Sequence, residues 1–386
     1  MYPTISDLIS DLFGIHIPLP IQSFGFFVAI SFLLAAYTLS KELKRKESLG
    51  LILPSTRKVL VGAPATRQEI IINALIGFLV GYKLIYFAMH YGSLVDNPQK
   101  ALLSTEGTFI GGLLSGLAMG YWKYREKEKS KKEKPEWVDE TVPPHELVGN
   151  ITMVAAVSGL IGAKIFHNLE YPEDLLRDPV DALLSFSGLT MYGGLIVGAL
   201  ATLWYGKKHG IAPLHLCDAA AAGLMLAYGF GRIGCQVAGD GDWGIVNNAS
   251  MPGWLGFLPD WFWSYNYPHN VINEGIAIPG CIGKHCYILE QPVFPTPLYE
   301  SIVCIAFFFV LWGLRKRFTV AGRFFSVYLI LNGVERFAIE SIRVNSKYHL
   351  AGISFTQAQL ISLLLVVTGI ACYIYLGQKR STQHSQ

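Results

Sequence analysis

The sequence predicts an all-α protein that spans a membrane several times, and three observations support this fold class. Of its 386 residues, 52% are hydrophobic and only 15% are charged, so apolar residues are more frequent than in an ordinary soluble domain. They gather in about nine segments that approach the roughly 20 residues needed to cross a bilayer. Lys and Arg concentrate in alternate connections between these segments. One helical bundle in lipid is therefore favoured over soluble domains.

The predicted spans follow one another along the whole chain. Their approximate ranges are 19–40, 68–90, 101–121, 146–167, 189–206, 214–234, 296–314, 322–341 and 355–376. Placing the N-terminus outside puts most of the 31 Lys and Arg residues on the cytoplasmic side, where positive loops prefer to lie. The C-terminus is then cytoplasmic.

Two of the predicted hairpins resemble each other in sequence at an offset of about 81 residues. Residues 81–85 match 162–166, and residues 108–116 match 190–198. Each copy contains a small-xxx-small pattern, which packs helices closely. Both copies enter from the same side, so the repeat is tandem and parallel, unlike the inverted repeats of many transporters.

The chain accordingly divides into five parts. Residues 1–121 hold the first span and the first hairpin copy, and 122–146 are interpreted as a charged, solvated cytoplasmic linker. Residues 147–234 hold the second copy and the sixth span, 235–295 form a small cap on the outer side, and 296–386 hold the last spans. Within the cap, the spacing of Cys281 and Cys286 leaves both a disulfide and two free thiols open.

Charged residues within predicted spans are costly in lipid and indicate functional sites. Arg232, Glu300 and Arg336 belong to three different spans, and all three lie toward the outer side. Glu340 and Arg343 follow Arg336 at a spacing that places them on the same helical face.

Two guanidiniums at headgroup depth suit a phosphate, and so an anionic phospholipid. The alternative is an internal ion pair that holds helices together, which is our interpretation of Glu335. No phosphate-binding loop or metal-ligand motif is present in the sequence, which gives no indication of a metal, another cofactor or nucleic acid as a ligand.

Four motifs, in this order, resemble those of the prolipoprotein diacylglyceryl transferase family. They are Gly-Arg-Ile-Gly at 231–234 with Trp-Gly at 243–244, Pro-Thr-Pro-Leu-Tyr-Glu at 295–300, Arg-Phe-x2-Glu-x2-Arg at 336–343 and Thr-Gln-Ala-Gln-Leu-Ile-Ser at 356–362. The resemblance covers the first span and most of the chain from about residue 148 to residue 376. The family usually has seven spans, and the duplicated hairpin accounts for the additional pair.

The sequence also departs from the family pattern near these motifs. Tyr192 stands where the family has His, Cys235 where it has Asn, and Phe24 where it has Tyr. The family's acidic residue beyond Arg232 corresponds to either Asp240 or Asp242.

The resemblance implies a bacterial inner-membrane enzyme with a periplasmic N-terminus and cap. It would transfer the diacylglyceryl group of phosphatidylglycerol to the Cys thiol of a preprolipoprotein signal peptide, with membrane lipids as its other partners. By resemblance and chemistry, Arg232 would bind the headgroup phosphate and Arg336 the departing phosphate, oriented by Glu340 and Glu300. The further substrate-binding residues would be Gly193, Gly194, Gly234, Gly239, Asp240, Tyr299 and Arg343.

The proton acceptor is the least determined role. A phenol is a poor base near neutral pH, so Tyr192 would position the substrate while Asp240 or the lipid phosphate takes the proton. Two alternative functions stay open: a catalytically altered relative that binds phospholipid, and a membrane transporter or flippase, for which intramembrane charges are also typical.

Overall fold

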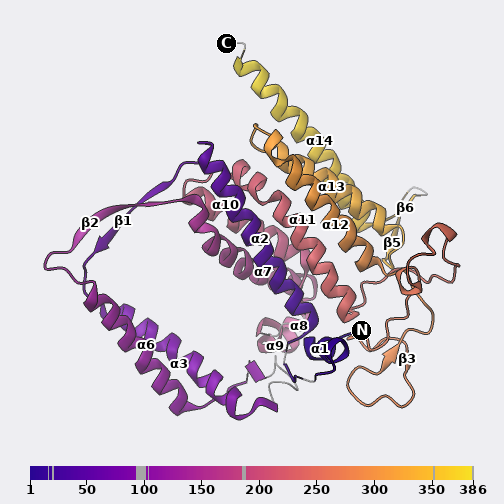
Figure 1. Cartoon of the computed structure of the whole chain (residues 1–386), viewed down its shortest axis with the longest axis horizontal. Helices are drawn as coiled ribbons and strands as arrows, with labels where there is room; N and C mark the ends of the chain where they lie inside the picture. The colour runs from indigo at the N-terminus through magenta and orange to yellow at the C-terminus, as the bar shows by residue number, and fades with distance from the viewer. Residues whose placement is uncertain are drawn as a thin grey trace.

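The computed structural model describes residues 1–15, 17–19, 21–92, 101–102, 104–184, 188–350 and 353–384, and within them the chain is mostly helical (Figure 1). The long helices are α2 (Ser23–Ser48), α3 (Arg67–Met89), α6 (Phe109–Lys129), α7 (Val148–Glu170), α10 (Met191–Lys208), α11 (Pro213–Ala238), α12 (Thr296–Leu314), α13 (Arg323–Glu340) and α14 (Gln357–His384). The short helices are α1 (Ile5–Phe13), α8 (Pro172–Arg177) and α9 (Pro179–Leu184). An all-α membrane fold is thus supported.

Each predicted span overlaps one of the long helices. Among the described residues, six helical stretches are long and apolar enough to cross a membrane, and they lie on α2, α3, α7, α11, α12 and α14. Helices α6, α10 and α13 fall below that measure, so a count of nine crossings stays a prediction. The predicted third span, 101–121, includes Leu103, which lies outside the described residues.

Three helices continue well past the predicted ends of their spans. Helix α2 continues to Ser48, α6 to Lys129 and α14 to His384, each eight residues beyond the predicted end. The extra turns of α2 and α6 are rich in Lys, Glu and Arg, which are good helix formers although they are not apolar. Hydropathy therefore marks the apolar stretch, whereas the helix itself continues past it.

Helix α11 occupies the centre of the bundle, where it packs against α2, α12 and α13 (Figure 1). Small residues on its buried face allow this close packing, and at Gly223 a Cβ would come within 2.4 Å of the Thr38 hydroxyl on α2. Pro213 begins the helix, and Gly239 ends it in the left-handed conformation with φ 67°.

The duplicated hairpins are α3–α6 and α7–α10, and their internal packing is equivalent. Gly81 approaches the carbonyl of Gly111 in the first, just as Gly162 approaches that of Gly193 in the second. The first hairpin stands apart from the bundle at the lower left of Figure 1, below an antiparallel ribbon of β1 (Ser55–Val61) and β2 (Glu136–Val142). The predicted linker over 122–146 is thus partly ordered as the end of α6 and β2, because its residues pair with β1.

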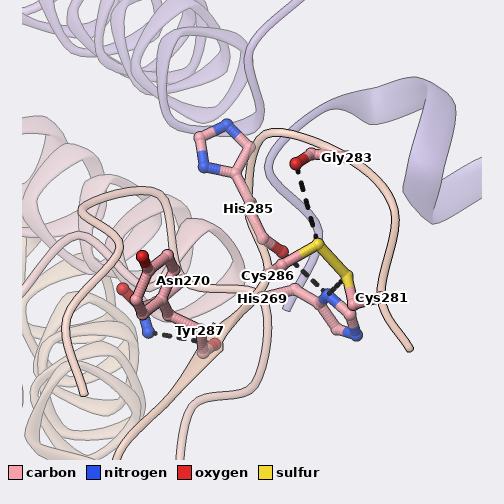
Figure 2. Close-up of a disulfide and its surroundings, with 7 residues drawn as sticks. All are labelled: His269, Asn270, Cys281, Gly283, His285, Cys286 and Tyr287. Carbon is pink, nitrogen blue, oxygen red and sulfur yellow. Dashed lines mark hydrogen bonds between the residues drawn. A yellow bond between two sulfur atoms is a disulfide. The ribbon is translucent and has the colours of Figure 1, made fainter. Parts of the chain in front are cut away.

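The segment over 235–295 folds around a small apolar cluster of its own, formed by Trp243, Tyr267, Leu289 and Val293. Its strands are β3 (Ile276–Ala277) and β4 (Tyr287–Ile288), and a further strand pair, β5 (Lys347–Leu350) and β6 (Ile353–Thr356), precedes α14. A disulfide joins Cys281 to Cys286, with the imidazole of His269 3.9 Å from Cys281 Sγ (Figure 2). Of the two alternatives for these cysteines, the bonded form is present.

Candidate functional site

Glu300 is the centre of a charged cluster at one end of the bundle. It lies in the first two turns of α12, and its side chain is fully buried. Its carboxylate pairs with Arg232 from α11, with Arg336 from α13 at 3.2 Å and with Arg343 at 2.9 Å. The predicted convergence of Arg232, Glu300, Arg336 and Arg343 is therefore present, with one carboxylate shared by three guanidiniums.

Asp242 joins the cluster from the loop that follows α11. Its two carboxylate oxygens pair with Arg232 and Arg343 respectively. The backbone supports this position, because Thr296 donates its hydroxyl hydrogen to the Asp242 carbonyl at 2.8 Å and Ile245 donates its N–H to the Ile342 carbonyl at 2.8 Å. Of the two acidic residues considered beyond Arg232, Asp242 is thus its ion-pair partner.

Arg336 and Glu340 form the third part of the cluster. They pair at 3.1 Å across one turn of α13, as their spacing predicted, and Asn345 donates its amide to Glu340 at 2.6 Å. Tyr228 donates its hydroxyl hydrogen to Glu300 at 3.3 Å, and its ring lies 5.3 Å from the Arg232 guanidinium. Sequence reasoning missed Tyr228 and Asn345, because their types carry no charge pattern.

Three guanidiniums and three carboxylates balance in this cluster, which lowers the cost of burying them. Each guanidinium has five N–H donors, so donors remain after the ion pairs are made. The Arg336 side chain is 23% exposed, against 11% for Arg232 and 8% for Arg343. Chemically, the cluster can bind a phosphate, with Arg336 as its most accessible cation.

The two aspartates after α11 differ in their electrostatics. Burial by itself would raise the pKa of Asp242, but Arg232 and Arg343 outweigh it and hold that pKa below its ordinary value. Burial raises the pKa of the Asp240 carboxyl, which lies beside the Cys235 thiol. The two arginines therefore favour the anionic form of Asp242, whereas Asp240 binds a proton more readily than an ordinary aspartate.

Cys235, Asp240 and Asp242 also lie within 4.8 Å of one another through their ligand atoms, which is close enough to hold a metal ion. Asp242 is, however, engaged by two arginines. Proximity alone therefore gives no support for a metal here.

The predicted glycines lie at helix contacts. At Gly193 and Gly194, which follow Tyr192 on α10, a Cβ would meet the Gly162 and Gly159 carbonyls of α7 at 2.5 Å and 3.1 Å. At Gly234 it would meet Phe27 of α2 at 3.0 Å, and at Gly239 it would meet Asn270 at 3.0 Å. These positions serve packing in the protein itself, and close approach of a lipid to them stays a prediction.

Tyr299 and Glu335 lie next to cluster residues in the sequence but have different surroundings in the structure. Tyr299 donates its hydroxyl hydrogen to the Phe262 carbonyl at 2.7 Å, so it fastens α12 to the 235–295 segment. The interpretation of Glu335 as an ion-pair residue was wrong: among the described residues, neither of its buried carboxylate oxygens has a hydrogen-bond partner. Successive residues on a helix point about 100° apart, so Glu335 lies off the face of α13 that carries Arg336.

Fold and site together define a multi-pass membrane protein with a buried arginine–carboxylate cluster at one end of its bundle. The family model of prolipoprotein diacylglyceryl transferase matches residues 134–375, and the chain belongs to this family. Its duplicated first hairpin lies outside the matched range.

Three relatives, each named phosphatidylglycerol–prolipoprotein diacylglyceryl transferase, illustrate the similarity. The Shouchella clausii protein is 29% identical over 264 residues, which cover 68% of this chain and 83% of that protein. The Leptospira interrogans protein is 29% identical over 219 residues, covering 49% of this chain and 59% of that protein. The second such transferase of Clostridium perfringens is 29% identical over 226 residues, covering 58% and 77%.

Proposed function

We propose that this protein transfers the diacylglyceryl group of phosphatidylglycerol to the lipobox cysteine of preprolipoproteins. The thiolate sulfur forms a bond to the glycerol carbon while the bond from that carbon to the phosphate oxygen breaks. Glycerol 1-phosphate leaves, and the thiol proton passes to a base or to the departing phosphate. The observation that carries the proposal is the cluster of three arginines around Glu300 in a chain of this family.

The arginines have separate tasks in this reaction. Arg232, held by Glu300 and Asp242, binds the headgroup phosphate. Arg336 is the most exposed of the three, and it stabilises the charge that develops on the leaving phosphate. Glu340 and Arg343 position these groups through their contacts with Arg336 and Glu300.

Asp240 is the proton acceptor that best fits the site. Asp240 would take the proton-accepting role of the family's His, because this chain has Tyr192 at that His position. Its carboxyl lies beside the Cys235 thiol, and burial raises its pKa above the ordinary value for an aspartate. Tyr192 positions the lipid or the peptide.

The proposed topology has nine crossings, a periplasmic N-terminus and cap, and a cytoplasmic C-terminus in a bacterial inner membrane. The Cys281–Cys286 disulfide supports it, because disulfides persist in oxidising compartments and the bond lies in the proposed cap. The basic ends of α2 and α6 favour the same orientation.

A transfer assay tests the function directly. Purified protein is incubated with labelled phosphatidylglycerol and a lipobox peptide, and mass spectrometry detects a thioether-linked diacylglyceryl group on the peptide cysteine. Arg336→Ala should lower the rate at least about 100-fold. Arg57→Ala, at an exposed position on β1, is the matched control and should keep the full rate.

A second candidate function is supported by Tyr192 and Cys235, which replace polar residues of the family. A catalytically altered relative would bind phosphatidylglycerol through the same arginines without transferring it. Lipid binding that depends on Arg232, combined with no thioether product, would favour this second function over the first.

A further inference from the structure

A cavity of about 320 Å³ lies at the end of the bundle opposite Glu300. The connection between α12 and α13 lines it on one side and Tyr373 of α14 on the other. Its polar lining consists of Arg317, Arg323, Thr319 and Tyr373, and the remaining residues are apolar. The proposed transfer reaction uses none of these residues.

The two arginines in this cavity form no ion pair with a carboxylate of the described residues. Across these ranges, no carboxylate lies within ion-pair distance of Arg317 or Arg323. The nearby acids are engaged elsewhere: Glu42 pairs with Arg45 and Arg315, and Asp218 accepts hydrogen bonds from the start of α13. The cavity therefore carries positive charge that the described part of the chain does not neutralise.

The Arg323 guanidinium is held in place before any ligand arrives. It stacks 4.0 Å from the centre of the Tyr373 ring, and a Cβ added at Gly377 of α14 would come within 3.4 Å of its Cζ. Its Nε is buried and has no hydrogen-bond partner within the described part of the chain. A fixed guanidinium whose Nε–H has no partner among the described residues suits a phosphate, which accepts two parallel N–H bonds.

The cavity is too far from the Glu300 cluster for one lipid headgroup to occupy both. Helix α13 has 18 residues, beginning at Arg323 beside the cavity and ending at Glu340 in the cluster. At about 1.5 Å per residue this is roughly 27 Å, close to the hydrocarbon thickness of a bilayer. In the proposed topology, the two groups of arginines face opposite leaflets.

We propose that this cavity binds a phosphate-bearing anion, the headgroup of an anionic phospholipid in the leaflet opposite the Glu300 cluster. Arg317 and Arg323 bind the phosphate, and the apolar lining contacts the glycerol and the upper acyl chains. A free phosphate ester offers the same chemistry from the aqueous side, and competition distinguishes the two sources.

Photolabelling tests this site independently of the transfer reaction. The full chain is reconstituted in phosphatidylcholine nanodiscs that contain phosphatidylglycerol with a photoreactive headgroup, and labelled peptides are mapped by mass spectrometry. Labelling of residues 314–323 should fall at least about tenfold in the double variant Arg317→Gln/Arg323→Gln. Lys316→Gln, at an exposed neighbour outside the lining, is the matched control and should label like the wild type.

Competition and folding controls complete the experiment. Unlabelled phosphatidylglycerol should compete for this label, whereas phosphatidylcholine and millimolar inorganic phosphate should not. Competition by inorganic phosphate as effective as that by the lipid would overturn the lipid as the source. Equal labelling of the double variant, with an unchanged thermal midpoint, would overturn the site itself, as would equal loss in Lys316→Gln.

Discussion

Two buried carboxylates lie at opposite ends of the central helices, and they are neutralised in different ways. Glu300 is shared by three guanidiniums. Asp218 near the start of α11 accepts the backbone N–H groups of Gly322 and Phe325, each at 2.9 Å, and pairs with Lys46 at 3.4 Å. Backbone amides at a helix start are fixed donors that Asp218 satisfies, whereas guanidiniums keep donors for a ligand. One site therefore suits substrate binding, and the other fastens helices together.

Of these substitutions, we expect replacement of Glu300 to have the largest effect on stability and activity. Glu300→Ala removes the fully buried carboxylate that three guanidiniums share, and we expect a loss of about 3–5 kcal/mol in unfolding free energy. Denaturant titration in detergent measures it, and transfer activity should be lost as well. Glu290→Ala, an exposed glutamate of the 235–295 segment, is the control and should change neither quantity. A stable, active Glu300→Ala protein would contradict the central role of this carboxylate.

Asp218→Asn should have a smaller effect of a different kind. The amide keeps one acceptor oxygen but turns an N–H toward a donor, so we expect a loss of about 1–3 kcal/mol in unfolding free energy. The transfer rate per folded molecule should be unchanged, because among the described residues the ion-pair and hydrogen-bond partners of Asp218 lie on α2 and at the start of α13, away from the Glu300 cluster. Asp260→Asn, at an exposed position, is the control. A stable Asp218→Asn protein without activity would mean that this end also serves catalysis.

Asp240→Asn should produce a still smaller change in stability, and one that depends on pH. A carboxyl whose pKa is raised on folding contributes stability below its ordinary pKa of about 4 and loses that contribution as the pH rises through the raised value. At neutral pH the neutral amide should therefore raise the thermal midpoint slightly above that of the wild type.

The difference between Asp240→Asn and the wild type should vanish in acid. Thermal scans of both proteins in the same detergent, between pH 4 and pH 8, measure this difference in thermal midpoint. The range begins at the ordinary pKa of an aspartate, about 4. If Asp240 is the proton acceptor, Asp240→Asn should also lose transfer activity while it still binds phosphatidylglycerol. Full activity at neutral pH would remove Asp240 from that role.

The smallest effect is expected at the ion pair between Arg57 and Glu140 on the β1–β2 ribbon. Their side chains are 65% and 50% exposed, so water and salt screen the attraction. Glu140→Gln should change the unfolding free energy by less than about 0.5 kcal/mol and leave the transfer rate unaltered. A loss of unfolding free energy as large as that of Asp218→Asn would show that burial does not explain the difference between this exposed ion pair and the buried contacts of Asp218.

Local patterns in the sequence predicted those contacts of the site that join residues of the same helix. The spacing of Arg336 and Glu340 predicted their ion pair, because residues four apart on a helix are neighbours. Asp242 could not be chosen over Asp240 in the same way. Both follow the left-handed turn at Gly239, and the left-handed Gly241 lies between them, so the path of the loop decides which carboxylate reaches Arg232.

The sequence by itself determined the helices, their apolar stretches, the repeat, and the charged residues that belong to one end of the bundle. Each of these depends on hydropathy or on helical spacing, which are local properties. Only the tertiary structure decided that Glu300 is shared by three arginines. The same holds for two findings on the described residues: the carboxylate oxygens of Glu335 have no hydrogen-bond partner there, and the second arginine pair lines a cavity without an ion-paired carboxylate. Those features depend on how different helices meet, and no single stretch of sequence contains that geometry.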